Sequence, residues 1–357
     1  MKLHDNQLQL IRHLIRFNTL DYPSCLEVLD TNNTGDRVSL SYTFRPLTKN
    51  DYIAKNKNGI VSILKKGRGI FPDEKRLISE GSNTTARQRV LQVSRVAALM
   101  EKNDVIIIGE LPENELPHFI PSACWRNIAQ GVLSTTRFTG MLLAYGRKYA
   151  VYDIGDGKME WQLRAESSLF YTKYGSYETK ADGMILICDN GKREKIAENI
   201  IRQTMWNRRT LLEEHYTERN RPVNFSRSPI KLRTQYERVY LIERGNIRGG
   251  LNWIYRDEEI INNTADGSRI NDAKLGDIED WPTRYFINPA YDLLKLVYFF
   301  SAVKTYHALE KNSSFPSPDV RYAIIMQQED LPIINMYPDV KNSERVNVYV
   351  FRFEEDA

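Results

Sequence analysis

The chain is poor in cysteine and has no pair of cysteines at short spacing. Its three cysteines, Cys25, Cys124 and Cys188, are far apart and odd in number. A disulfide framework and a structural zinc site both require paired cysteines, so the sequence predicts neither of them. Isolated cysteines are typical of a reducing compartment, and we expect a cytoplasmic protein.

Long apolar runs are also lacking. Charged residues and histidines interrupt residues 1–17, which therefore do not have the continuous apolar segment of a signal peptide. The most apolar run, residues 293–303, contains Lys295 and is shorter than the ~20 residues that span a bilayer. We expect a buried helix over about 290–311 and no membrane partner.

The motifs of common enzyme classes are absent. The chain has no G-x-x-x-x-G-K-[ST], no G-x-G-x-x-G and no G-x-S-x-G. The five histidines are scattered, without metal-ligand spacing and without the histidine cluster and tyrosine of a relaxase: His4, His13, His118, His215 and His307. We expect no cofactor, no metal and no nicking activity.

A metal-dependent nuclease stays open as an alternative. Such an enzyme needs acidic residues and a lysine on neighbouring strands, where they hold a divalent cation and activate water. Asp153, Asp156 and Lys158 are spaced D-x-x-D-x-K but cross a Gly-Asp-Gly turn, and Asp182 and Asp189 flank one expected strand. Both spacings depart from what the chemistry needs, so we favour ordinary polar turns and a chain without catalytic residues.

What the chain does contain is enough apolar material for two domains. Of its 357 residues, 41% are hydrophobic and 27% are charged, so it is not expected to be disordered. We expect an α+β protein with an N-terminal winged helix-turn-helix over 1–75, a linker helix within 76–103 and a mixed α/β domain over 104–357.

The first 71 residues predict three helices and a hairpin. Apolar residues at helical spacing favour helices over 6–17 and 22–29, and a polar turn follows at 31–36. A third helix begins near residue 37, capped by Asp36 or Ser39. Because Pro46 cannot donate a backbone hydrogen bond, we expect this helix to end near Arg45. Residues 54–71 are expected to form a β-hairpin that turns at Asn58-Gly59.

Helix, helix, helix and a two-stranded wing is the plan of a winged helix, whose third helix enters the major groove of DNA. Residues 37–72 hold eight basic residues and one acid, Asp51, a local charge of +7 against +4 for the whole chain. Such a balance suits contact with phosphates. We expect Ser39, Ser41 and Tyr42 to contact bases. The remaining candidates are basic and are expected to contact phosphates: Arg37, Arg45, Lys49, Lys55, Lys57, Lys65, Lys66 and Arg68.

Two segments follow one another in the chain, LSYTFRPLTKNDYIAKNKNGIVSILKKGRGIF and the helix RQRVLQVSRVAALMEKND. In this order they resemble the replication-relaxation family of bacterial plasmids and integrative mobile elements. The resemblance covers residues 6–104 and weakens beyond them. It implies a winged helix, a larger domain related to the restriction-endonuclease fold, and DNA binding in replication, mobilisation or transcriptional control. Because the acids and lysines lack the spacing of a nuclease, we expect such a fold to be degenerate here.

The rest of the chain predicts elements but no chemistry. The helix over 85–102 either docks the winged module on the larger domain, which we favour, or forms a homodimer interface. We expect strands at 105–108, 140–143, 149–153, 159–163, 183–188, 238–243, 251–255, 321–326 and 346–353, and a helix at 192–207.

Two stretches have strongly unequal charge. Residues 192–233 hold eleven basic residues and five acids with interspersed aromatic residues, which suits either nucleic acid or a solvated helix face. Residues 256–292 hold nine acids and four bases and are expected to form an exposed loop.

The favoured function is that of a non-enzymatic accessory or regulatory protein that binds double-stranded DNA. The alternatives are the nuclease and a factor, such as an antitoxin or an inhibitor of host defence, whose winged module or α/β domain binds a protein partner.

Overall fold

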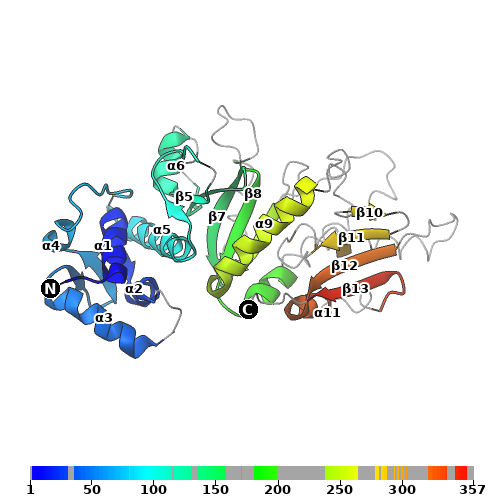
Figure 1. Cartoon of the computed structure of the whole chain (residues 1–357), viewed down its shortest axis with the longest axis horizontal. Helices are drawn as coiled ribbons and strands as arrows, with labels where there is room; N and C mark the ends of the chain where they lie inside the picture. The colour runs from blue at the N-terminus through cyan, green and yellow to red at the C-terminus, as the bar shows by residue number, and fades with distance from the viewer. Residues whose placement is uncertain are drawn as a thin grey trace. The chain divides into compact units, whose positions relative to one another are not determined.

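The computed structural model describes residues 2–30, 36–79, 81–114, 116–129, 133, 136–157, 170, 181–199, 238–263, 278–280, 283–287, 293, 296, 299–300, 303, 321–335 and 342–351 (Figure 1). The chain is a mixed α+β protein that divides into two compact units. The first unit comprises Met1–Asp153 with Lys173–Ala181, and the second comprises Ile154–Thr172 with Asp182–Ala357. None of the described helices combines the length and the apolar composition that crossing a bilayer requires.

The N-terminal elements follow one another in the order helix, strand, helix, helix, strand, strand. They are α1 (Asp5–Phe17), β1 (Thr19–Asp21), α2 (Tyr22–Leu29), α3 (Arg37–Lys49), β2 (Ile53–Lys55) and β3 (Ile60–Ile63). The three strands form an antiparallel sheet in the order β1-β3-β2, with Leu20 opposite Val61 and Ile53 opposite Ile63.

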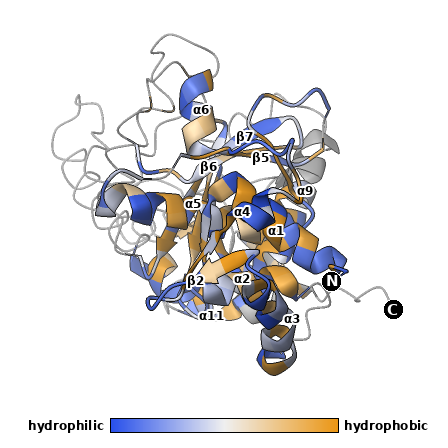
Figure 2. Ribbon diagram, turned by 90° about the vertical axis from the view of Figure 1, so that its left-hand side faces the viewer, coloured by the Kyte–Doolittle hydropathy of each residue, from blue (hydrophilic) through white to orange (hydrophobic). Residues whose placement is uncertain are grey.

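A shared apolar core holds these elements together. Each of the three helices presents one hydrophobic side to it, as the hydropathy colours of Figure 2 show. Leu10 and Leu14 of α1, Leu29 of α2 and Leu47 of α3 are at most 1% exposed, as is Val61 of β3. Burial of this apolar surface is the main driving force for the fold of the segment.

Helix α3 does not end at Arg45 as the proline predicted, because it continues through Pro46 to Lys49. Pro46 leaves the carbonyl of Tyr42 without its helical donor. Burial on both sides of the proline favours continuation, since Phe44 is 4% exposed and Leu47 is fully buried. The last carbonyls also gain donors, because Asn50 donates from its backbone N and its side-chain Nδ2 to the Pro46 carbonyl at 3.1 and 2.8 Å.

The hairpin is shorter than the one predicted over residues 54–71. It pairs β2 with β3 around Asn58-Gly59, and Gly59 has a φ of +75°, which favours glycine. Residues after Ile63 turn into a short helix, α4 (Lys65–Arg68), instead of continuing the strand. Buried Gly67 permits this path, because a Cβ there would lie 2.3 Å from the Tyr52 carbonyl oxygen.

Helix α5 (Thr84–Lys102), capped by Asn83, matches the expected linker helix. It packs against β1, α2 and α1 on one side and against β4 (Ile106–Ile107) and β5 (His118–Pro121) on another. The expected boundaries after residues 75 and 103 both fall inside the first unit, because α5 joins these two groups of elements.

A mixed sheet completes the first unit. Its strands β4, β5, β6 (Gly140–Ala144) and β7 (Arg147–Gly155) lie in sequence order, with α6 (Ser122–Ile128) between β5 and β6 in the chain. β4 and β5 are parallel, while the other pairs are antiparallel. The expected strand 105–108 is reduced to two residues, of which Ile107 is buried and Ile106 is 41% exposed.

The second unit contains a parallel pair of strands, β8 (Gly183–Cys188) and β9 (Arg238–Glu243), both at the expected positions. Every residue of β8 is buried. Residues 193–199 are helical, which confirms the start of the helix expected over 192–207, while residues 200–207 lie outside the described residues. The short helix η4 (Arg244–Asn246) leads from β9 into α9 (Ile247–Asn263).

Helix α9 overturns two expectations. Residues 251–255 are helical and not a strand, because Ile247, Leu251 and Ile254 are buried at helical spacing. The helix also includes residues 256–263, so the start of the acidic stretch is not a loop. Residues 264–277 lie outside the described residues.

A second mixed sheet has the order β10-β11-β12-β13. Its strands are β10 (Ile278–Asp280), β11 (Thr283–Ile287), β12 (Arg321–Gln327) and β13 (Val346–Phe351), and η6 (Gln328–Asp330) and α11 (Leu331–Asn335) follow β12. β10 and β11 pair antiparallel and the other strands are parallel. A helix was expected over 290–311, and its described residues, 293, 296, 299, 300 and 303, are helical and buried. The strand expected at 159–163 lies outside the described residues.

Candidate nucleic-acid interface

Helix α3 has a firmly anchored inner face. Leu40, Phe44 and Leu47 recur at helical spacing and are buried. The Asp36 side chain caps the helix by accepting hydrogen bonds from the backbone N of Val38 at 3.0 Å and of Ser39 at 3.3 Å. On the inner side, Gln7 of α1 donates from Nε2 to the Thr43 carbonyl at 2.8 Å. These contacts fix both the start and the orientation of the helix.

The outer face of α3 is exposed and changes in character along its length. It begins with apolar Val38, continues through Tyr42 and ends with the cations Arg45 and Lys49. The guanidinium carbon of Arg45 lies 4.8 Å from the centre of the Tyr42 ring, which holds these two side chains together. Val38 was not among the residues predicted to contact DNA, although its spacing of four residues from Tyr42 places both on one face.

Ser41 differs from the other expected base-contacting residues. It is half-buried, and its hydroxyl oxygen accepts a hydrogen bond from the Tyr22 hydroxyl at 3.3 Å. Tyr22 also lies beneath Lys55, whose Nζ is 3.4 Å from the ring centre. Tyr22, which the sequence analysis did not single out, therefore contacts both α3 and the hairpin and sets their spacing.

The tip of the hairpin is built from asparagines. The Asn56 side-chain oxygen accepts hydrogen bonds from the backbone N of Asn58 and of Ile60, both at 2.9 Å. These bonds shape the turn on which Lys57 is exposed next to Lys55. The two lysines therefore lie on a defined loop at the end of the sheet.

Three of the candidate cations, Lys65, Lys66 and Arg68, lie on α4 and not on the hairpin. Lys66 packs over the Tyr52 ring at 4.7 Å. Arg68 donates to the side-chain oxygen of Asn18 at 2.8 Å, and Arg76 donates to the same atom at 3.0 Å. This anchoring restrains the α4 cations while their side chains remain exposed.

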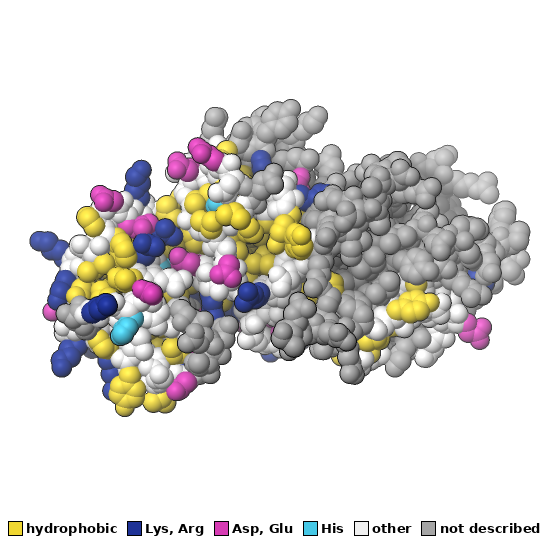
Figure 3. Space-filling model, viewed as in Figure 1, with side chains coloured by type: hydrophobic (Ala, Val, Ile, Leu, Met, Phe, Trp, Pro, Cys, Tyr) yellow, Lys and Arg dark blue, Asp and Glu magenta, His cyan; other side chains and the backbone are white. Residues whose placement is uncertain are grey.

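Of the eleven residues predicted to contact DNA, ten are exposed and Ser41 is half-buried. We call these eleven residues, on α3, the hairpin and α4, the basic surface. Lys and Arg side chains line the left-hand rim of the space-filling view, over the N-terminal elements (Figure 3). Exposed cations with few neighbouring acids are what electrostatic contact with phosphates requires.

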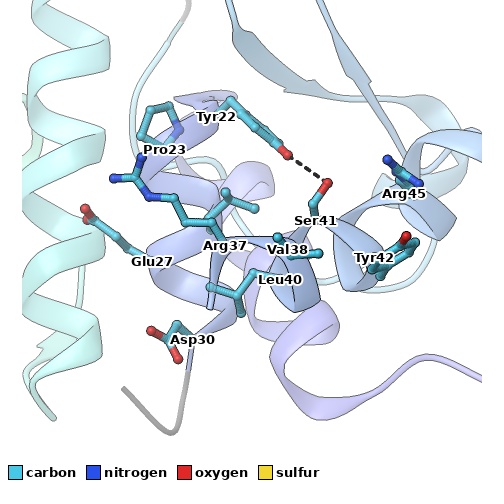
Figure 4. Close-up of a pocket in the computed structure, with 11 residues that line it drawn as sticks. Tyr22, Pro23, Glu27, Asp30, Arg37, Val38, Leu40, Ser41, Tyr42 and Arg45 are labelled. Carbon is cyan, nitrogen blue, oxygen red and sulfur yellow. Dashed lines mark hydrogen bonds between the residues drawn. The ribbon is translucent and has the colours of Figure 1, made fainter. Parts of the chain in front are cut away.

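A hollow of about 630 Å³ lies between α2 and α3 (Figure 4). The side chains of Val38 and Tyr42 border it on the α3 side, and Pro23 and Leu26 border it on the α2 side. Its two acidic residues, Glu27 and Asp30, come from the end of α2 and lie away from Tyr42 and Arg45 in Figure 4.

A buried polar cluster fastens α5 to α1. The imidazole of His13 is fully buried, with Nδ1 3.0 Å from a Glu101 carboxylate oxygen and Nε2 3.1 Å from the Ser94 hydroxyl. Burial alone would raise the pKa of Glu101. The hydrogen bond and charge of His13, with the charges of Arg16 and Arg12, outweigh burial and hold the pKa below its usual value. The cluster is a structural joint rather than part of the basic surface.

The acids proposed for a nuclease fall in two places. The backbone N of Asp189 donates to the Gly155 carbonyl at 2.8 Å, so Asp189 lies beside the turn that contains Asp156, whereas Asp182 lies at the other end of β8. Asp182 precedes β8 and Asp189 follows it, so about seven residues at about 3.3 Å each place them about 23 Å apart along the strand. Asp189 accepts a hydrogen bond from Arg244 Nε at 2.9 Å. Asp156 lies in a turn after buried Asp153, and Lys158 lies outside the described residues. In the described part of the chain, no group of three histidine, cysteine or acidic side chains is arranged to hold a metal ion.

The carboxylate of Glu243, at the end of β9, has a structural role. Glu243 accepts from the backbone N of Gly191 at 2.9 Å and of Arg193 at 3.4 Å, which caps the helix beginning at 193. Arg193 in turn pairs with buried Asp330. Most of the basic stretch 192–233 lies outside the described residues.

Comparison of the chain with family models, with characterised proteins and with solved structures gave no match.

Proposed function

We propose that residues 2–79 form a winged helix-turn-helix that binds double-stranded DNA, and that the protein is a non-enzymatic accessory or regulatory DNA-binding factor. The element order α1-β1-α2-α3-β2-β3 and the sheet order β1-β3-β2 support the winged-helix assignment. In such a fold the third helix lies in the major groove and the hairpin approaches the backbone.

The observation that carries the proposal is the exposure of the basic surface. Eight basic residues against one acid between residues 37 and 72 give this segment a charge of +7, whereas the rest of the chain sums to −3. All eight basic side chains are exposed. Exposed side chains of one sign repel each other in the free protein, and phosphates relieve this repulsion while counterions leave the DNA.

The resemblance of residues 6–104 to the replication-relaxation family adds the setting. It implies that the DNA belongs to a bacterial mobile element and that binding serves its replication, mobilisation or transcription. A selection of bound sequences from a random pool of duplexes would identify the target, and its position within the element would identify the process.

Charge reversal on α4 tests the proposal. We expect the full chain to bind a fluorescent 20-base-pair duplex with an affinity that falls steeply with salt, and the variant Lys65→Glu with Lys66→Glu to bind at least tenfold more weakly. Each cation that contacts a phosphate contributes a slope of about 0.9 in log affinity against log salt. The control, Lys102→Glu, reverses one charge at the end of α5, outside the basic surface, and is expected to bind like the wild type.

Unchanged binding by the double variant would remove α4 from the interface. Absence of salt-dependent binding by the wild-type chain would overturn the proposal as a whole. Circular dichroism of each variant separates a lost contact from a lost fold.

A protein-binding role is the second candidate, and one observation favours it. Val38 and Tyr42 are 67% and 61% exposed beside the hollow, and exposed apolar side chains also occur in protein interfaces. Copurification with a protein partner in a fixed ratio, with no retention on DNA, would support this role over DNA binding.

A further inference from the structure

The two most exposed large hydrophobic side chains in the described part of the chain are neighbours. Val38 is 67% exposed and Tyr42 is 61% exposed, one helical turn apart on the outer face of α3. Other large apolar side chains of this helix are buried against the core. A pair of apolar groups in water on an otherwise well-packed helix calls for a partner that offers apolar surface.

The place of Val38 on the helix narrows the choice of partner. It is the second residue of α3, and the Asp36 cap fixes its backbone by accepting a hydrogen bond from its N–H at 3.0 Å. When such a helix lies in the major groove, its N-terminal residues contact the edges of the bases. The apolar group that the major groove presents is the C5 methyl of thymine.

The charges around the pair favour DNA over an apolar protein surface. Arg45 stacks on Tyr42, Lys49 follows one turn later, and the hairpin adds Lys55 and Lys57. The apolar pair of Val38 and Tyr42 would contact the methyl group in the groove. The cations beside Tyr42 would contact the phosphates that border the groove. The acids of the hollow lie on the α2 side, away from Tyr42 and Arg45 (Figure 4).

We infer that Val38, with the Tyr42 ring beside it, recognises the C5 methyl group of a thymine in the major groove. The inference rests on the proposed function and adds a preference for particular bases. It assigns the polar residues Ser39 and Arg45 to the flanks of this contact. It leaves Ser41, which is half-buried and accepts a hydrogen bond from Tyr22, outside this contact.

Replacing thymine by uracil removes the methyl group and leaves the Watson–Crick pair intact. The test measures binding of the full chain to its selected duplex, with each thymine replaced in turn by deoxyuridine. In the wild type, we expect replacement at one position per binding site to weaken binding about fourfold, the equivalent of about 0.8 kcal/mol for burying one methyl-sized group.

The variants Val38→Ser and Val38→Thr complete a double-mutant cycle. Because Val38 is 67% exposed, neither change is expected to disturb folding, and circular dichroism provides the check. With Val38→Ser, we expect the same thymine-to-uracil replacement to change affinity less than about 1.5-fold, since the methyl no longer meets an apolar partner. Val38→Thr keeps one methyl and is expected to retain part of the sensitivity.

Three results would overturn the inference. If the wild type binds every uracil duplex as it binds the thymine duplex, no methyl is contacted, although salt-dependent binding still supports the proposed function. If the sensitivity persists unchanged with Val38→Ser, another residue makes the contact. If the wild type shows no salt-dependent duplex binding at all, the proposed function fails together with the inference, and the patch belongs to a protein interface.

Discussion

The hairpin lysines offer a quantitative test of the basic surface. Lys55 and Lys57 are exposed at the end of the sheet, Lys55 over the Tyr22 ring and Lys57 on the asparagine-lined turn. The perturbation is Lys55→Ala with Lys57→Ala, which removes two positive charges and leaves the turn residues in place.

The magnitude follows from counting charges. If all eight exposed basic residues of the basic surface neutralise one phosphate each, log affinity falls against log salt with a slope of about −7, at about 0.9 per phosphate. Removing two of them is expected to reduce the slope by about 1.8. At 0.1 M salt the variant then binds about 60-fold more weakly than the wild type, and the two affinities converge near 1 M.

Fluorescence anisotropy over a range of salt concentrations measures both slopes on one duplex. The matched control is Lys102→Ala, which removes one positive charge at the end of α5 and is expected to leave the slope unchanged. The reasoning is refuted if the double variant keeps the wild-type slope, or if Lys102→Ala lowers it as much per charge.

Three further changes test the scaffold behind this surface. Asp36→Ala removes the cap of α3 and is expected to lower the free energy of unfolding by about 1 kcal/mol, measured by urea denaturation; no loss would show that the cap contributes nothing. Leu47→Ala empties a fully buried position beyond Pro46 and is expected to cost about 2–5 kcal/mol in the same measurement, whereas a cost below about 1 kcal/mol would contradict the packing described. The pKa of Glu101 is lower in the folded protein than in the unfolded chain, where it is near 4.5. The stabilising effect of Glu101 is therefore complete above pH 4.5 and is lost as the pH falls through the pKa of the folded protein. Glu101→Gln is expected to destabilise the protein at pH 7 and to reduce the fall in melting temperature below pH 4.5; an unchanged acid profile would contradict this assignment.

Much of the local structure could be predicted where a periodic apolar pattern coincides with a clear start or stop. Helix α2 and strand β9 have the expected bounds. In α2, Pro23 occupies the first turn, where its missing N–H costs nothing. The apolar run in β9 is short enough to favour a strand.

The errors arise where tertiary packing overrides a local signal. Pro46 predicts the end of α3, but burial of Leu47 just beyond it favours continuation of the helix. The segment 251–255 is short and apolar, and such a pattern does not distinguish a strand from part of a buried helix. Lys65 and Lys66 come directly after a strand pattern, so the sequence predicted that the hairpin would continue through them. The chain instead forms α4, where Gly67 lies close to the Tyr52 backbone.

The candidate site was predicted in composition but not in detail. Charge counting identified the exposed cations of α3, the hairpin and α4 from the sequence alone. It could not identify Tyr22, whose contacts with Ser41 and Lys55 join residues far apart in the chain. It also passed over Val38, because an apolar residue in a helix is more often buried than exposed.

The most direct test asks whether α3 lies in the major groove. All three native cysteines are buried, and burial helps to raise the pKa of the Cys188 thiol to about 12, so a new surface cysteine can be labelled selectively. An iron–EDTA group attached to Ser39→Cys is predicted to cleave the selected duplex within a few base pairs at one major-groove position, while the same group on Lys102→Cys leaves that position intact. Cleavage from Lys102→Cys at that position, or none from Ser39→Cys on a bound duplex, would contradict the placement of α3 against DNA.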